Sequence, residues 1–127
     1  MKVVLILYYL GVVEGWQGFW KNPRFTRGAM INFRDPAYSA EDGGYHPVEI
    51  ALNGVGRLYY ITDFAYVGTG GCAELVKELD FDFDIGLFQQ FAMEYPIATG
   101  RMLYQIWENN FISYYEMGVY QVSLKAL

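Results

Sequence analysis

A β-hairpin predicted in the middle of the chain constrains the fold more than any other feature. Residues 48–53, "VEIALN", alternate large apolar side chains with Glu, Ala and Asn, which is the period of a half-buried strand. Asn53 and Gly54 then form a pair that tolerates the positive φ of a tight turn. A second apolar segment, "RLYYITDFAYV", covers residues 57–67. The pattern therefore predicts two antiparallel strands joined by a short turn.

Alternation predicts three more strands, at 29–34, 79–85 and 119–125. Segment 57–67 is apolar on both faces, which indicates a central strand or one whose outer face meets a partner. In 79–85, three aspartates share one face, and we expect these like charges to place the strand at an edge of the sheet.

Helical spacing replaces strand spacing in the last third of the chain. A helix is predicted over 99–117, with an apolar stripe formed by Leu103, Ile106, Trp107, Phe111 and Tyr114. The segment "GLFQQFAMEY", which ends just before Pro96, is predicted to form a shorter helix. Strands grouped first and helices late predict an α+β fold with a mainly antiparallel sheet.

Composition supports one domain and excludes several function classes. A chain of 127 residues with 54% hydrophobic residues can bury a core, so we expect a single domain over 1–127. The net charge of −5 disfavours binding to nucleic acid or to an anionic membrane. The single cysteine, Cys72, excludes an internal disulfide and a multi-cysteine zinc site, and it fits a reducing, cytoplasmic compartment.

The N-terminal segment "MKVVLILYYLGVV" is apolar but too short to span a bilayer as a helix. No A-x-A-like cleavage site follows it, as a signal peptide would require. We expect it to be a buried structural element.

Gly68, Gly70 and Ala73 have the G-x-G-x-x-A spacing of dinucleotide-binding loops. The strand predicted from residue 79 leaves room for only about two helical turns after them. No parallel partner strand is predicted either. The glycines are therefore interpreted as a loop between antiparallel strands.

The polar stretch "NFRDPAYSAEDGGYHPVEI", residues 32–50, carries possible metal ligands: Asp35, Glu41, Asp42, His46 and Glu49. It lacks the regular ladder of acids that wraps calcium, and one histidine is a poor basis for a transition-metal site. Residues 35–46 are therefore predicted to form an ordered connection without a metal, and no cofactor is expected.

No catalytic residue is predicted. His46 is the only histidine, and it could be a general base only with a suitable partner. No serine lies in a nucleophile-elbow context, and Cys72 has no known catalytic signature. A non-enzymatic role is favoured.

Asp63 is unusual because it interrupts an aromatic strand. A buried carboxylate needs a partner, which Arg34 or Arg57 could provide as an ion pair, or the N–H groups of a loop as hydrogen-bond donors. Alternatively, Asp63 forms one wall of a polar pocket, near Asp35 and His46, in a small-ligand-binding or hydrolytic domain. The candidate binding residues are Arg34, Asp35, Tyr38, Tyr45, His46 and Asp63. A concave pocket onto which these groups converge would favour the pocket, and a flat apolar face would not.

Aromatic residues make up 19% of the chain, with twelve tyrosines. A tyrosine buries its ring while its hydroxyl keeps a polar partner, as at protein interfaces. For most of these residues an aromatic core is the better interpretation. The tyrosines are also compatible with the favoured function, a protein that acts through protein–protein contacts with an unknown partner, and with a homo-oligomer.

Several segments together resemble a small bacterial family of unknown function: "INFRDPAYSAEDGGYHPVEIAL", "YYITDFAYVG", "ELDFDFDIGLFQQF", "EYPI" and "FISYYEMGVY". The resemblance covers about residues 29–122. It implies a fold similar to that of the mitochondrial acidic matrix proteins, which are acidic, form ring-like oligomers and bind other proteins. The expected structure is a twisted, mainly antiparallel sheet with helices packed on one face, and a long C-terminal helix followed by a final strand. The resemblance supplies no catalytic residues.

Overall fold

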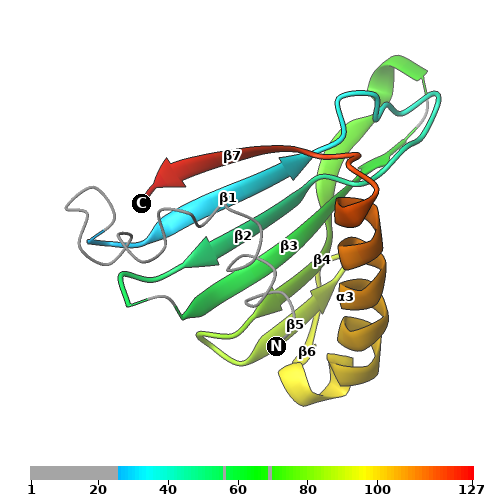
Figure 1. Ribbon diagram of the computed structural model, residues 1–127. Helices are drawn as coiled ribbons and strands as arrows, with labels where there is room; N and C mark the ends of the chain where they lie inside the picture. Colours follow the sequence, from blue (N-terminus) through cyan, green and yellow to red (C-terminus); the bar gives the residue numbers. More distant parts are fainter. Residues whose placement is uncertain (1–25, 56, 69) are drawn as a thin grey trace.

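The computed structural model describes residues 26–55, 57–68 and 70–127. Their main feature is a seven-stranded antiparallel sheet in the order β6-β5-β4-β3-β2-β1-β7 (Figure 1). Its strands are β1 (Ala29–Arg34), β2 (Val48–Leu52), β3 (Leu58–Val67), β4 (Glu74–Asp82), β5 (Leu87–Gln90), β6 (Met93–Pro96) and β7 (Gln121–Ala126). The expected buried element at the N-terminus lies outside the described residues.

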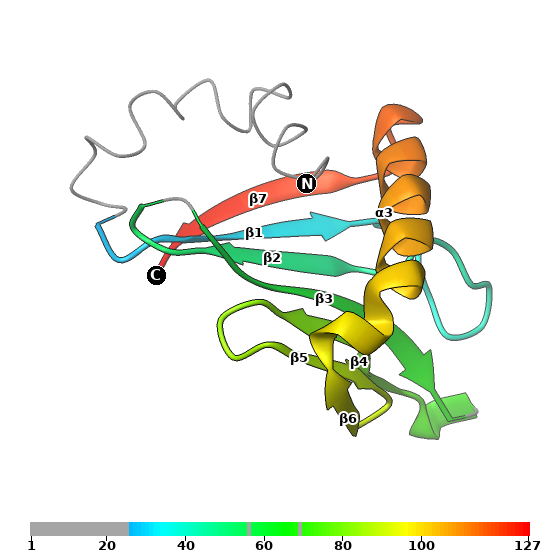
Figure 2. The same ribbon diagram turned by 90° about the horizontal axis from the view of Figure 1, so that it is seen from below.

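One long helix, α3 (Arg101–Glu116), lies across one face of the twisted sheet and is followed by the final strand β7 (Figures 1 and 2). This arrangement confirms the predicted α+β class and the antiparallel sheet. Within the described residues, no helix is long and apolar enough to cross a membrane.

The core lies between α3 and the sheet. Phe111 is 2% exposed, and its ring stacks on Trp107 at 5.1 Å and meets the edge of Phe33 at 5.0 Å. Phe81 on β4 stacks on Phe88 of β5 at 5.2 Å. The Phe33–Phe111 contact and the edge contact of Phe81 with Tyr104 at 5.0 Å hold α3 against the strands, because edge-to-face ring pairs add attraction to the burial of apolar area.

The helix begins later than predicted. A short 3₁₀ helix, η3 (Ile97–Gly100), precedes α3. A Cβ on Gly100 would lie 2.8 Å from the Phe88 ring, so only glycine allows this close approach. Trp107 and Phe111 of the predicted stripe are buried, whereas Ile106 is 58% exposed and lies outside the core.

The short helix predicted just before Pro96 is wrong, because these residues form the β5–β6 hairpin. Phe91 and Ala92 both have positive φ, 45° and 68°, and connect the two strands. Positive φ at both central residues is typical of a type I′ turn, which usually contains Asn and Gly. Phe and Ala at these two positions therefore give no sequence signal for a turn.

The edge position predicted for residues 79–85 is also wrong. β4 starts at Glu74 and lies between β3 and β5. Its aspartates are accommodated by hydrogen bonds: Thr62 donates its hydroxyl hydrogen to Asp80 at 2.6 Å, and Asp82 accepts the backbone N–H groups of Asp84 and Ile85. The chain therefore turns after Asp82, which leaves Ile85 63% exposed.

The other strand predictions are confirmed to within two residues. Segment 57–67 is a central strand, paired with β2 and β4. As predicted, the glycines between β3 and β4 connect antiparallel strands, and the described residues of this connection include a short 3₁₀ helix, η2 (Gly70–Cys72).

Candidate functional site

The connection from β1 to β2 is built around Asp35. Its two carboxylate oxygens accept the backbone N–H groups of Ala37, at 2.9 Å, and Tyr45, at 3.1 Å. Gly44 has φ of 132°, and a Cβ there would lie 2.9 Å from the Asp35 carboxylate. Asp35 and Gly44 therefore close the loop and bring Tyr45 and His46 to the start of β2.

His46 is held beside β3 by its neighbours. The carbonyl of Pro47 accepts the N–H of Phe64 at 2.9 Å, which ties the residue after His46 to the residue after Asp63. The Tyr38 ring lies 5.4 Å from the imidazole, and its hydroxyl oxygen accepts the N–H of Tyr66 at 3.0 Å.

A β-bulge positions Glu78. Asp63 pairs with Leu79 and Phe64 pairs with Lys77, so Glu78 is the extra residue on β4. Neighbouring residues of a regular strand point to opposite faces, but Glu78 and Leu79 line the same cleft. Bulges redirect side chains in this way and are common near functional sites.

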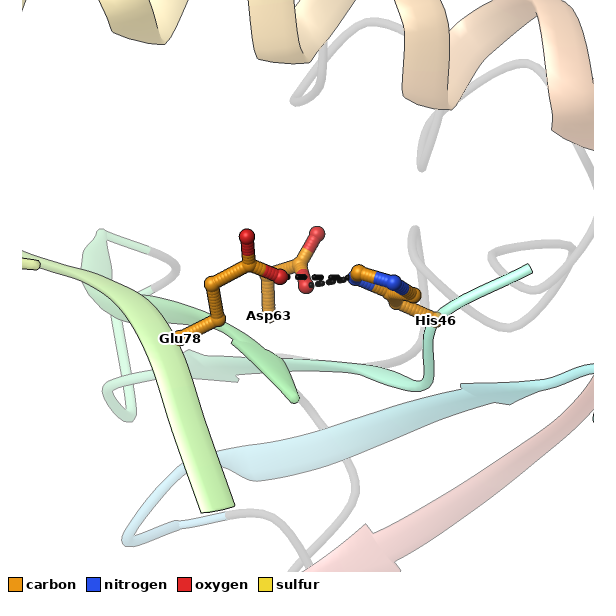
Figure 3. A group of neighbouring side chains, drawn as sticks. All are labelled: His46, Asp63 and Glu78. Atoms are coloured by element: carbon orange, nitrogen blue, oxygen red, sulfur yellow. Dashed lines mark hydrogen bonds and ion pairs between the residues drawn. The ribbon is translucent and has the colours of Figure 1, made fainter. Parts of the chain in front are cut away.

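Three side chains from separate segments meet at one point (Figure 3). His46 Nδ1 lies 2.8 Å from Asp63 Oδ1 and 2.9 Å from Glu78 Oε2. The Trp107 indole N–H donates to the other Asp63 oxygen, Oδ2, at 2.9 Å. This buried bond links α3 directly to the cluster. We use the name acid–histidine cluster for His46, Asp63 and Glu78.

The cluster raises the pKa of His46 above 6.5. The hydrogen bond to Asp63 is the largest cause; burial of the ring acts in the opposite direction, and the charges of Asp63 and Glu78 add to the rise. Because the folded-state pKa is the higher one, the stabilisation by protonated His46 is complete below pH 6.5 and is lost as the pH rises through that folded-state value.

A cleft of about 300 Å³ adjoins the cluster, between α3 and the sheet. One end is polar and contains the cluster. The remaining wall is mainly apolar and aromatic, and it includes Tyr45, Leu103, Trp107, Phe111, Tyr114 and Tyr120. Burial, with a smaller contribution from the charge of Asp63, raises the pKa of Tyr120 above its usual value.

The structure brings three of the candidate residues to the cleft: Tyr45, His46 and Asp63. Asp35 and Tyr38 instead support the loop that carries His46. Arg34 is exposed at the end of β1, where it pairs with Gln121 of β7.

The partners expected for Asp63 were wrong. Its carboxylate is bound by His46 and Trp107 rather than by Arg34 or Arg57. Arg57 is exposed, and its backbone N–H bonds to Asn53 in the turn after β2.

Sequence reasoning missed two important residues, Glu78 and Trp107. Glu78 was not singled out from the sequence, and Trp107 was interpreted only as part of a helical stripe. A signal for Glu78 does exist: the apolar residues Val76 and Leu79 are three residues apart, which breaks strict alternation and is typical of a bulge. Trp107 is 44 residues from Asp63 and has no comparable local signal.

Fold and site together define the class: an α+β protein whose single described long helix covers an antiparallel sheet and encloses a cleft with a polar end. The chain belongs to the family described as "Protein of unknown function (DUF2787)", which matches residues 20–125. The predicted resemblance to a family of unknown function is thereby confirmed.

Two solved structures are similar to the chain. The hypothetical protein VC0508 from the VSP-II pathogenicity island of Vibrio cholerae is 40% identical, with a TM-score of 0.70 over 77% of this chain and 81% of that one. The conserved hypothetical protein VC1805 from pathogenicity island VPI-2 of Vibrio cholerae is 45% identical, with a TM-score of 0.68 over 76% and 79%. VC1805 is described as sharing structural homology with the human P32 protein. A search of curated proteins found no match.

Proposed function

We propose that the protein is a small-molecule-binding domain whose ligand occupies the cleft between α3 and the sheet. The supporting observation is the convergence of His46, Asp63 and Glu78 at one end of a concave, aromatic cleft. A concave pocket, rather than a flat apolar face, was the feature that would favour ligand binding. The volume of about 300 Å³ is at the lower end of the range for small-molecule sites.

The lining indicates the chemistry of the ligand. The Tyr45 and Tyr114 rings, whose centroids lie 4.6 Å apart, offer π surfaces to a flat apolar group, and the buried Trp107 and Phe111 form the apolar wall behind them. Asn110 and Tyr120 add polar atoms to the wall. The ligand class is therefore a small molecule with a ring and a polar substituent that reaches the acid–histidine cluster.

Replacing Ile106 by arginine is expected to weaken binding. Ile106 lines the cleft but is 58% exposed, so a longer charged side chain can obstruct the cleft without disturbing the core. The probes are three ring fragments: benzoate, benzyl alcohol and benzylamine. For each fragment that binds the unmodified protein, the affinity should fall by about tenfold or more, equivalent to about 1.4 kcal/mol. Ligand-observed NMR measures this affinity.

Met102→Arg is the matched control. Met102 is one helical turn before Ile106, is 77% exposed, and does not line the cleft. Both variants should unfold at the temperature of the unmodified protein, and only Ile106→Arg should bind less. Absence of fragment binding to the unmodified protein, or equal binding by both variants, contradicts the proposal.

A second candidate function is contact between copies of the chain through the β5–β6 hairpin. Phe91 and Met93 in this hairpin are 51% and 62% exposed, and β6 is an edge strand within the described sheet. Exposed apolar side chains on an edge strand favour pairing with another strand. This observation supports the homo-oligomer expected from the aromatic composition.

Light scattering tests self-association. We expect a dimer or larger species at micromolar concentrations and above, and a monomer after Met93→Lys, because lysine on an edge strand opposes edge-to-edge pairing. A monomer mass for the unmodified protein at every concentration would rule out this function.

A further inference from the structure

In the acid–histidine cluster, one imidazole nitrogen faces more hydrogen-bond acceptors than it has hydrogens to donate. One imidazole nitrogen, His46 Nδ1, lies within hydrogen-bonding distance of two carboxylates, Asp63 at 2.8 Å and Glu78 at 2.9 Å. That nitrogen carries at most one hydrogen, so two carboxylate oxygens share a single donor.

The charge of the cluster is also unbalanced. With both carboxylates ionised, the net charge is −1 when His46 is protonated and −2 when it is neutral. Asp63 is only 9% exposed, and a buried charge requires compensation. A divalent cation bound to neutral His46 and the two carboxylates gives a net charge of zero.

The three atoms also have the spacing of metal ligands. His46 Nδ1, Asp63 Oδ1 and Glu78 Oε2 lie within 4.8 Å of one another, and two of the separations are 2.8 and 2.9 Å. Two ligand atoms about 2.1 Å from one ion, at 90° to 109°, are about 3.0 to 3.4 Å apart. Small side-chain movements therefore suffice to place one ion among the three atoms.

The surroundings supply two further features of a metal centre. Trp107 donates its indole hydrogen to Asp63 Oδ2, the oxygen that does not face His46, and so fixes the orientation of that carboxylate from outside the cluster. The three residues also line the cleft, so water or a ligand oxygen can complete the coordination of an ion.

We propose that His46, Asp63 and Glu78 form a binding site for one divalent transition-metal ion, such as Zn²⁺ or Mn²⁺, at the polar end of the cleft. An imidazole nitrogen with two carboxylates suits these ions better than Mg²⁺ or Ca²⁺, which prefer oxygen ligands alone. No metal was expected from the sequence, because only ligands within and next to the loop at 35–46 were considered together. Asp63 and Glu78 come from β3 and β4 instead.

The experiment uses protein that carries no histidine tag and has been freed of metal by a chelator. This protein is titrated with the metal alone at pH 7.5. All proteins carry Cys72→Ser, since this free, exposed thiol could bind zinc independently. Competition with a colorimetric chelator measures Zn²⁺ affinity. We expect one Zn²⁺ per chain, and an affinity at least about tenfold lower in His46→Gln and in Glu78→Gln, because each loses a ligand.

Two further variants separate direct coordination from general effects. Glu74→Gln removes an exposed carboxylate from the same strand as Glu78 and should bind like the parent protein. Trp107→Phe keeps all three ligands but loses the donor to Asp63, and should bind about 10- to 100-fold more weakly. Circular dichroism verifies that each variant is folded.

The single histidine provides a direct spectroscopic test. Sub-stoichiometric Mn²⁺ should broaden the proton NMR signals of the His46 ring at lower concentrations than it broadens those of exposed residues elsewhere. Absence of saturable binding, or equal binding by the parent protein, His46→Gln and Glu78→Gln, would mean an adventitious ion only and would overturn the proposal. The metal titration contains no organic ligand, so its outcome is independent of the proposed small-molecule function.

Discussion

Replacing Phe111 by alanine is expected to lower the free energy of unfolding by about 3 to 5 kcal/mol, the usual range for a buried phenylalanine. Phe111 is 2% exposed, and its ring contacts those of Phe33, Trp107 and Tyr120, with centroids 5.0 to 5.5 Å away. Alanine leaves a cavity that this rigid aromatic core cannot fill completely. Urea unfolding followed by circular dichroism measures the loss.

The matched control is Phe91→Ala. Phe91 is 51% exposed in the β5–β6 turn, so at a protein concentration too low for copies of the chain to associate, the same chemical change should alter the free energy of unfolding by no more than about 0.5 kcal/mol. Similar losses in the two variants would show that α3 is not held to the sheet through Phe111.

Replacing Asp63 by alanine is expected to lower the free energy of unfolding by about 1 to 3 kcal/mol, since it leaves a buried donor without its acceptor. That donor is the indole N–H of Trp107, 2.9 Å from Asp63 Oδ2. In a Trp107→Phe background the donor is absent, so the same replacement should cost less. The double-mutant cycle should give a coupling energy of about 0.5 to 3 kcal/mol.

A second cycle pairs Asp63→Ala with Val55→Ala. Val55 is 72% exposed in the turn before β3, and the part of that strand from Leu58 to Asp63 alone spans about 16.5 Å at 3.3 Å per residue. The two effects should add to within about 0.5 kcal/mol. A coupling near zero for Asp63 and Trp107 as well would mean that the indole–carboxylate bond does not stabilise the fold.

Much of the sheet could be predicted because apolar and polar residues alternate regularly along its strands. Strand β1 has the predicted bounds, and Asn53-Gly54 indicates the β2–β3 turn by local chemistry alone. The β5–β6 hairpin could not be predicted, because its two turn residues, Phe91 and Ala92, have positive φ, and neither is a residue type that favours that conformation.

The candidate site could be predicted where a polar residue stands out against apolar neighbours. His46 and Asp63 were found in this way. Glu78 was hidden, because it lies among other acids and reaches the cleft only through a one-residue bulge. Trp107 was hidden for a different reason: a tryptophan in an apolar stripe has the same sequence pattern whether or not its N–H meets a carboxylate.

The hydrogen bond from the Trp107 indole to the Asp63 carboxylate also ties α3 to the polar end of the cleft. Residues of α3 and of three strands line the cleft, so local unfolding that releases α3 removes the binding site. A molecule or ion that binds only the docked form stabilises that form by mass action, by about 2.7 kcal/mol at a concentration of one hundred times its Kd. The free energy needed to release α3 from the sheet would therefore rise with the free concentration of a molecule or ion bound at the proposed site.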